Sequence, residues 1–252
     1  MVYYIAAVLF SIVLYAAGLL FMKYLVQFRK FCDIDFPALI FILYFIEIVL
    51  LLVDVKIEDW SYLTLLPLGN VGPFMFFTLP FYFLLPKKVR KYVLTLVALL
   101  SPAMLLYGIM RGVTLVVAGT KAYASYVLDI ICHVVFAVYG VYLVRSEQVD
   151  IDIKRSLIAG AILFGVSILM LILNAIFRTS FFGLSVYGEH NLYNIIYIKS
   201  AVLSIFVFFI AFAALLTIGY FFQKYLAVAA KGLWGDTSEQ ESDSEESPND
   251  GE

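Results

Sequence analysis

The sequence predicts an all-α integral membrane protein, a polytopic bundle of seven transmembrane helices with its N-terminus outside the cell and its C-terminus in the cytoplasm. Three observations predict this fold class: an apolar composition, seven long apolar runs and basic loops that alternate with poorly charged ones. Of the 252 residues, 63% are hydrophobic, and the mean hydropathy is +0.98. A soluble domain is about half apolar, so lipid must be the solvent for much of this chain.

A membrane-spanning helix needs about 20 mostly apolar residues. The runs that meet this requirement are 3–22, 35–53, 61–85, 92–110, 123–144, 156–177 and 194–222. The first run has no basic segment before it, and Lys23 follows it instead. A secretory signal has the opposite order, so we expect a retained helix inserted with its N-terminus outside.

Basic residues set the predicted orientation. The loops 23–34, 86–91 and 145–155, together with the end of the last run, carry 12 basic residues, whereas the opposite side carries four. Short cytoplasmic loops are enriched in Lys and Arg, so the richer side is predicted to be cytoplasmic. The protein is therefore expected in the cell membrane.

The C-terminal segment 235–252 is polar and free of aromatic residues after Trp234, and it carries eight acidic residues. Such a composition cannot bury enough apolar surface to fold, so a disordered, solvated tail is predicted, with binding to a basic partner as the alternative. The remainder has a basic excess of six, confined to short loops. This pattern indicates membrane orientation and no nucleic-acid partner.

The third run is interrupted by helix-breaking residues: Pro67, Gly69, Asn70, Gly72, Pro73 and Pro80. Proline removes a backbone donor and kinks a helix. Backbone groups freed at membrane depth must face protein or water. Two interpretations stay open, a span that lines an internal cavity and a kinked helix that packs closely through glycine.

Ionisable residues inside spans are costly and usually mark function. The spans contain Glu47, Asp129, His133 and Lys199, with the uncharged polar residues Asn70 and Asn174 and with Arg111 at a helix end. In the predicted orientation most of them lie roughly 5–15 Å below the outer boundary, counting 1.5 Å per residue. We therefore predict one polar, ligand-binding pocket in the outer half of the bilayer.

Asp129 and His133 are four residues apart, so they share one helix face. A carboxylate beside an imidazole fixes its tautomer and raises its basicity, which makes this pair the candidate catalytic group. The alternatives are purely structural roles. His133 would be a hydrogen-bonded structural residue, Lys199 would extend to the membrane interface, or Glu47 and Lys199 would form an ion pair that only stabilises the bundle. No CxxC or HExxH spacing occurs, so no metal and no cofactor are predicted.

Several stretches carry a family resemblance: LeuLeuProLeu at 65–68, GlyProPhe at 72–74, LeuLeuProLysLysValArgLys at 84–91, TyrValLeuAspIleIleCysHis at 126–133 and TyrGlyGluHisAsnLeuTyrAsn at 187–194. They resemble the YwaF-like integral membrane family of bacteria, distant relatives of eukaryotic transmembrane ether-phospholipid acyltransferases. The resemblance implies a seven-helix bundle in the bacterial cytoplasmic membrane. In the acyltransferase relatives it implies acyl transfer by a cysteine with a histidine.

Two positions depart from the family pattern. Its span-three histidine and cysteine correspond to Gly69 and Val71, whereas its span-five histidine matches His133. Cys132 adjoins His133, but neighbours on a helix point about 100° apart, so Cys132 is expected to be a buried apolar residue. The resemblance thus leaves enzymatic activity undecided.

The favoured function is a YwaF-like protein that binds a membrane lipid or another amphiphile, as a catalytically degenerate relative of the acyltransferases. The first alternative is a small-molecule or proton-coupled transporter, with Glu47, Asp129 and Lys199 as relay groups. The second is a seven-helix receptor or sensor.

Overall fold

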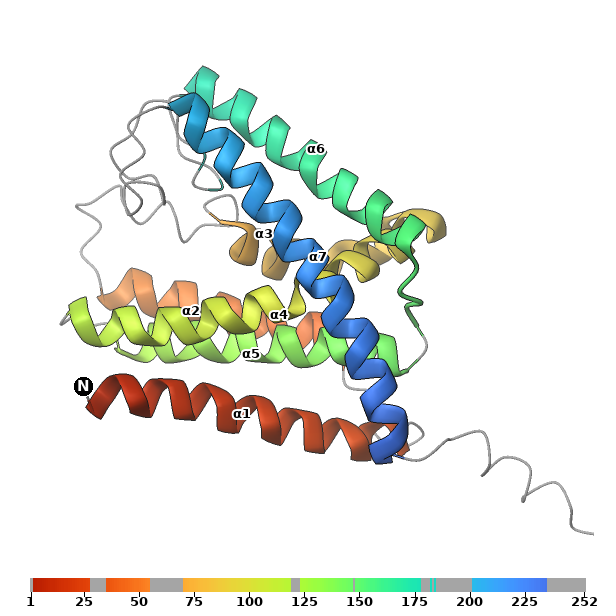
Figure 1. Ribbon diagram of the computed structural model, residues 1–252. Coiled ribbons are helices and arrows are strands. Elements are labelled where there is room, and N and C mark those ends of the chain that lie inside the picture. The colour runs from red at the N-terminus through yellow and green to blue at the C-terminus, as the bar shows by residue number, and fades with distance from the viewer. Residues whose placement is uncertain are drawn as a thin grey trace, which may run out of the picture.

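The computed structural model describes residues 2–27, 35–54, 70–118, 123–146, 148–177, 182, 184 and 201–234. Every regular element in these ranges is a helix, which confirms the all-α class (Figure 1). The elements are α1 (Val2–Gln27), α2 (Phe36–Asp54), α3 (Val71–Thr78), the 3-10 helix η2 (Leu79–Leu84), α4 (Lys87–Ala118), α5 (Tyr123–Arg145), α6 (Ile153–Phe177) and α7 (Ala201–Trp234). The acidic segment 235–252 lies outside the described residues.

Helices α4 and α5 form the centre of the bundle and make its most extensive contact. Helix α2 packs on α5, and α1 lies along both central helices (Figure 1). Helices α6 and α7 cross this group obliquely. The contact of each with α4 is more extensive than the contact between α6 and α7.

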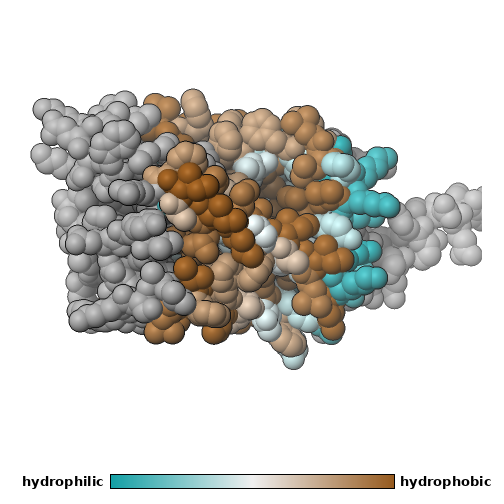
Figure 2. Space-filling view, turned by 90° about the horizontal axis from the view of Figure 1, so that it is seen from above, coloured by the Kyte–Doolittle hydropathy of each residue, from teal (hydrophilic) through white to brown (hydrophobic). Residues whose placement is uncertain are grey.

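Four helices in the described ranges are long and apolar enough to cross a membrane. Their apolar segments are Lys87–Met110, Val127–Arg145, Ile153–Phe177 and Ile205–Leu226. Shorter apolar segments occur at Val8–Phe21, Phe36–Leu50 and Val71–Leu84. Figure 2 shows the corresponding brown apolar band, with hydrophilic teal residues gathered at one end of it. The chain is thus a membrane-embedded helical protein.

Several helices extend beyond the predicted apolar runs. Helix α4 begins at Lys87, inside the predicted loop 86–91, and it continues to Ala118. The amides of Val89 and Arg90 donate to the carbonyl of Pro86, which starts the first turn. Hydropathy finds only the apolar part of a helix, whereas Lys and Arg are themselves good helix formers. Helix α7 also continues past 222 to Trp234, through a stretch rich in alanine, leucine and lysine, which favour helix.

The third run is not one continuous helix. Its described part is the eight-residue α3 followed directly by η2, which has Pro80 in its first turn. Because proline has no amide hydrogen, the α-helical pattern is interrupted there. Arg90 then closes the corner before α4, since its guanidinium donates to the carbonyls of Phe83 and Leu85. The predicted irregularity is confirmed, while residues 61–69 lie outside the described residues.

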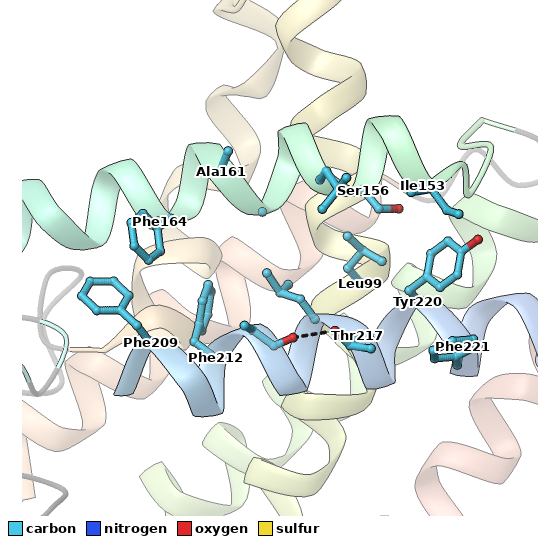
Figure 3. Close-up of a pocket in the computed structure, with 14 residues that line it drawn as sticks. Leu99, Ile153, Ser156, Ala161, Phe164, Phe209, Phe212, Thr217, Tyr220 and Phe221 are labelled. Atoms are coloured by element: carbon cyan, nitrogen blue, oxygen red, sulfur yellow. Dashed lines mark hydrogen bonds between the residues drawn. The ribbon is translucent and has the colours of Figure 1, made fainter. Parts of the chain in front are cut away.

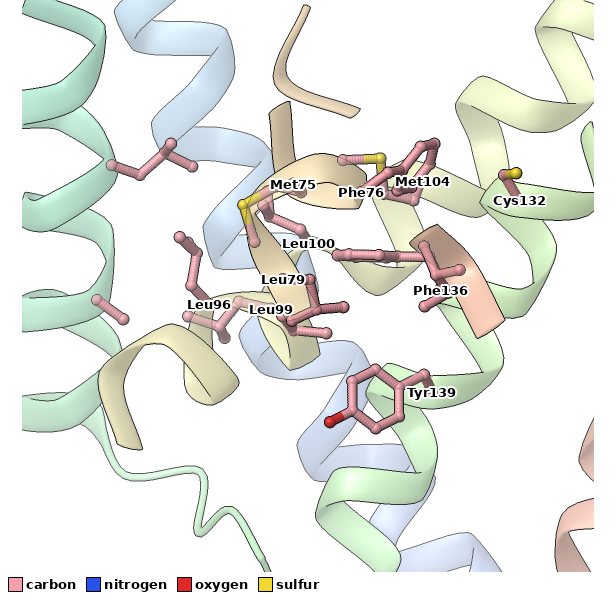
Figure 4. Packing of buried hydrophobic residues seen from close by; sticks show 14 of the residues in the cluster. Met75, Phe76, Leu79, Leu96, Leu99, Leu100, Met104, Cys132, Phe136 and Tyr139 are labelled. Atoms are coloured by element: carbon pink, nitrogen blue, oxygen red, sulfur yellow. The ribbon is translucent and has the colours of Figure 1, made fainter. Parts of the chain in front are cut away.

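Short α3 forms part of the core because its side chains fill the space between α4 and α5. Figure 4 shows Met75, Phe76 and Leu79 meeting residues of the two long helices. Phe76 is fully buried, and its ring lies 5.9 Å from Tyr44 and 5.6 Å from Phe136, measured between centroids. Residues 71–79 therefore hold a fixed position at the centre of the bundle.

Helix α4 changes direction partway along its length (Figure 1), and it contains Pro102. Proline leaves the carbonyl four residues earlier, Ala98, without its helix donor. The side chain of Gln223 on α7 donates to that carbonyl at 2.9 Å. Gly219 lies one turn earlier on α7, where a Cβ would overlap the carbonyl of Leu99. The crossing of α7 over α4 thus depends on the proline, the glutamine and the glycine.

Candidate functional site

His133 and Asp129 form a buried pair on α5. His133 is fully buried and Asp129 is 3% exposed. The Nδ1 atom of His133 lies 2.7 Å from the backbone oxygen of Asp129 and 3.3 Å from its carboxylate Oδ1. A carbonyl oxygen can only accept, so Nδ1 carries the proton. In the neutral imidazole Nε2 is then the hydrogen-bond acceptor.

The His133 ring is held between aromatic side chains from two other helices. Its centroid lies 4.9 Å from that of Phe76 on α3 and 4.8 Å from that of Tyr107 on α4. Glycines make room for it, because a Cβ at Gly72 would lie 3.0 Å from Nε2 and one at Gly108 would lie 2.9 Å from the His133 Cβ. The direction of Nε2, toward the start of α3, is therefore set by packing.

A cavity of about 200 Å³ lies on this side of His133. Its polar side chains are Asn70 at the start of α3, Tyr107 on α4 and His133 on α5, and its other walls are largely apolar. The lining residues are Asn70, Val71, Gly72, Leu100, Ala103, Met104, Tyr107, His133, Phe182, Phe208, Phe212 and Leu215. A few polar groups that converge on an otherwise apolar hollow are typical of a small-molecule site.

The N-terminus of α3 also lines the cavity. Asn70 has an extended backbone, with φ −142°, and its carbonyl accepts from the amide of Phe74 at 3.0 Å. The amides of Val71 and Gly72 precede any intrahelical acceptor, so helix geometry leaves them outside the helical ladder. Both residues line the cavity, so the positive end of the α3 dipole adjoins it. The cavity therefore combines an imidazole acceptor with a helix N-terminus.

Glu47 contributes a second buried carboxylate from α2. It is 5% exposed, and Tyr44, one turn away, is 2% exposed. Tyr44 and Cys132 both lie within electrostatic reach of Glu47 and Asp129. The structure thus brings the carboxylates of α2 and α5 into one buried region, but neither Glu47 nor Asp129 lines the 200 Å³ cavity.

Cys132 and His133 serve different parts of the bundle. Cys132 is fully buried, and its electrostatic neighbours are Glu47 and Asp129. His133 lines the cavity toward α3, and Cys132 is not among the lining residues. The prediction that Cys132 is a buried apolar residue is confirmed.

Asn174 is buried on α6 but does not line the cavity. Its amide donates to the carbonyl of Leu184 at 3.0 Å. Nearby in sequence, Phe182 does line the cavity, with a left-handed φ of 57° and a ring 5.3 Å from that of Phe74. Left-handed backbone is costly for an aromatic residue, so contacts such as these must hold it. Asn174 thus holds the backbone at Leu184, two positions after the cavity-lining Phe182, and does not itself line the cavity.

Two predicted site residues, Arg111 and Lys199, have side chains outside the described part of the structure. Arg111 belongs to α4, but its side chain lies outside the described part of the structure. Lys199 and Gly69 also lie outside it, whereas Val71 lines the cavity. Sequence reasoning missed Tyr107 and Gly108, which form an aromatic–glycine step within an apolar run. An aromatic residue followed by glycine in an apolar run permits close helix packing. This pattern is the signal that could have found these two residues.

Within the described residues, no group of three or more His, Cys, Asp and Glu side chains is arranged to hold a metal ion. No family model, no curated protein and no solved structure matches the chain. The fold and the site themselves therefore define the class: an all-helical, membrane-embedded protein with a buried His–Asp pair beside a small internal cavity.

Proposed function

We propose that this protein binds the polar group of a lipid or another amphiphile in the cavity beside His133. One observation carries the proposal: Nε2 of a fully buried histidine is directed to the start of α3, where a cavity of about 200 Å³ lies. Burying an imidazole and a carboxylate in a membrane-embedded bundle is costly. A bound polar group would offset that cost by hydrogen bonding.

The proposal includes seven spans, an N-terminus outside and an acidic tail in the cytoplasm. The support is the charge bias of 12 basic residues against four between the two sides. In that orientation the cavity lies in the outer half of the bilayer. The resemblance to the YwaF-like family supports the cytoplasmic membrane of a bacterium as its location.

The cavity walls suggest the chemistry of the ligand. Nε2 of neutral His133 accepts a hydrogen bond, so it fits a hydroxyl or amine donor. The amides of Val71 and Gly72 fit a carbonyl or phosphoryl oxygen. Phe208, Phe212 and Leu215 line the apolar part, which fits a hydrocarbon portion. A molecule with both kinds of group is an amphiphile.

Binding is favoured over acyl transfer. Within the described lining there is no Ser, Thr or Cys beside His133. The position at which the resembling family has its cysteine is Val71, which cannot act as a nucleophile. We therefore propose a degenerate relative that retains the histidine for binding.

Native mass spectrometry of the full chain, followed by lipid analysis, tests the proposal. The wild-type protein should retain a specific lipid that Gly72→Ala loses, because the added Cβ would lie 3.0 Å from Nε2. Gly165→Ala is the matched control, since nothing lies within 4 Å of a Cβ there. No specific lipid in the wild type, or equal retention in all three chains, would refute the proposal.

A second candidate is a proton-coupled transporter. The buried region shared by Glu47, Asp129, Tyr44 and Cys132 favours it, because clustered ionisable groups within spans can relay protons. Uptake into proteoliposomes that responds to pH and disappears in Asp129→Asn would support transport. Uptake unaffected by Asp129→Asn would exclude this relay.

A further inference from the structure

A second hollow, larger than the His133 cavity, lies between α6 and α7 (Figure 3). It is on the other side of α7 from that cavity. Its volume is about 520 Å³, and Leu99 of α4 lies at its floor. Leu157 and Phe164 line it from α6, and Phe209, Leu216 and Phe221 line it from α7. We call this hollow the α6–α7 groove. Phe212 lines both the groove and the His133 cavity, so it separates the two.

The groove faces the surroundings of the bundle and is almost wholly apolar. Leu157 is 69% exposed and Phe221 is 50% exposed. The hydroxyl of Thr217, one of its few polar lining groups, donates to the carbonyl of Ala213 at 2.8 Å (Figure 3). In a membrane-embedded protein such a surface meets hydrocarbon, and an unfilled groove would forfeit dispersion contacts. A flexible hydrocarbon chain is the natural filling.

The length of the groove corresponds to one leaflet. Its lining on α7 extends from Phe209 to Phe221. At 1.5 Å per residue this is roughly 18 Å. Half of a hydrocarbon core of about 30 Å is roughly 15 Å. One acyl chain of a membrane lipid therefore fits the groove from end to end.

Two lysines lie just beyond one end of the groove, on the same faces of α6 and α7 that line it. Lys154 precedes Leu157 by three residues and Ala161 by seven, so it lies on the α6 face that lines the groove. Lys224 follows Phe221 by three residues and Thr217 by seven on α7. Both are exposed, and the Lys224 Nζ lies 5.8 Å from the ring centroid of Tyr220.

Nearby acidic residues are engaged with Arg155. Its guanidinium lies 3.4 Å from the carboxylate of Asp150, and its amide donates to the carboxylate of Asp152. Within the described part of the chain, no salt bridge joins either lysine to a carboxylate. The end of the groove therefore presents two positive charges, one from each helix.

We propose that the α6–α7 groove binds one acyl chain of an anionic phospholipid, whose headgroup lies between Lys154 and Lys224. The apolar walls and the length of the groove select the chain, and the two lysines select a negative headgroup in that leaflet. This site is independent of the His133 cavity, because it lies on the opposite side of Phe212 and shares no polar residue with it.

The full chain in detergent is titrated with palmitoyl-oleoyl phosphatidylglycerol or with phosphatidylcholine of the same chains, and bound lipid is counted by native mass spectrometry. Phosphatidylglycerol should bind more tightly. Lys154→Gln and Lys224→Gln should each weaken it about fivefold, since one lysine near an anionic headgroup contributes about that factor. Phosphatidylcholine should respond little to either change.

The groove itself is tested by Ala161→Trp, which adds a large ring to an exposed lining position. It should weaken both lipids, whereas Ile162→Trp, an exposed non-lining position on the same turn, should not. Circular dichroism and gel filtration check that each variant is folded. The Gly72→Ala variant should leave phosphatidylglycerol binding unchanged, which separates this site from the His133 cavity.

Two results would overturn the proposal. Equal binding of both lipids, unaffected by the lysine changes and by Ala161→Trp, would mean that only non-specific annular lipid occupies the groove. A dimer mass without bound lipid, lost in Ala161→Trp, would mean that a second copy of the chain fills it.

Discussion

The side chain of Gln223 donates a hydrogen bond of 2.9 Å to the backbone carbonyl of Ala98, across the contact between α7 and α4. Ala98 is the residue whose helical donor is missing, because Pro102 stands four positions later. Gln223 also lies 2.6 Å from the hydroxyl of Ser101, which itself donates to Ala98 at 2.8 Å. A buried amide from a distant helix thus replaces a lost helix bond, and it fixes where α7 crosses.

Gln223→Leu should destabilise the protein by about 1 kcal/mol, because it removes the two interhelical hydrogen bonds to Ala98 and Ser101 and leaves Ser101 as the remaining donor to Ala98. Unfolding by SDS in mixed micelles measures the change in free energy. In a Pro102→Ala background the amide of residue 102 can donate to Ala98, so the cost of Gln223→Leu should fall. Equal costs in both backgrounds would show that the proline and the glutamine are not coupled.

Gly219→Ala should destabilise the protein by about 3 kcal/mol, since a Cβ there overlaps the carbonyl of Leu99 and α7 must move away from α4. The same unfolding assay measures it. Gly165→Ala on α6 is the matched control, because nothing lies within 4 Å of its added Cβ. There the better helix propensity of alanine should stabilise by about 1 kcal/mol. Similar losses at both glycines would contradict the close crossing.

Apolar runs are local signals, so the sequence predicted most of the helices, but it did not predict their caps. Asp35 and Asp152 lie at the starts of α2 and α6, and their carboxylates accept from the amides of Ala38 and Arg155. The run 61–85 was predicted to be irregular because its prolines are visible in the sequence. Its division into α3 and η2 was not, since that depends on how Phe76 and Leu79 pack between α4 and α5.

The sequence could predict only those contacts of the site that join residues of the same helix. The Asp129–His133 pair follows from a spacing of four residues, and it is present at 3.3 Å. The contacts of His133 with Phe76 and Tyr107 join α5 to α3 and α4, so no local pattern contains them. For the same reason, a spacing argument could not show that Asn174 binds the carbonyl of Leu184.

The tautomer of His133 is a direct consequence of its geometry. Nδ1 lies 2.7 Å from the backbone oxygen of Asp129, so this nitrogen should be protonated in the neutral ring. The chain has only two histidines, so His190→Gln leaves His133 as a single reporter for 15N NMR of the ring nitrogens. We expect a protonated Nδ1 and an unprotonated Nε2. Asp129→Asn keeps the backbone carbonyl and should keep this tautomer, whereas a protonated Nε2 in the neutral ring would contradict the geometry.

Cys132 should be inert in the folded protein despite its position next to His133. Its side chain is fully buried beside Glu47 and Asp129, so reagents cannot reach the thiol in the folded protein. The chain has two cysteines, Cys32 and Cys132. When Cys32→Ser removes the other thiol, maleimide should modify Cys132 only after unfolding in SDS. Cys132→Ala should also leave lipid retention at the His133 cavity unchanged, because the thiol does not line it. Rapid labelling of the native chain, or loss of that lipid in Cys132→Ala, would mean that the thiol reaches the cavity and that acyl transfer through it must be reconsidered.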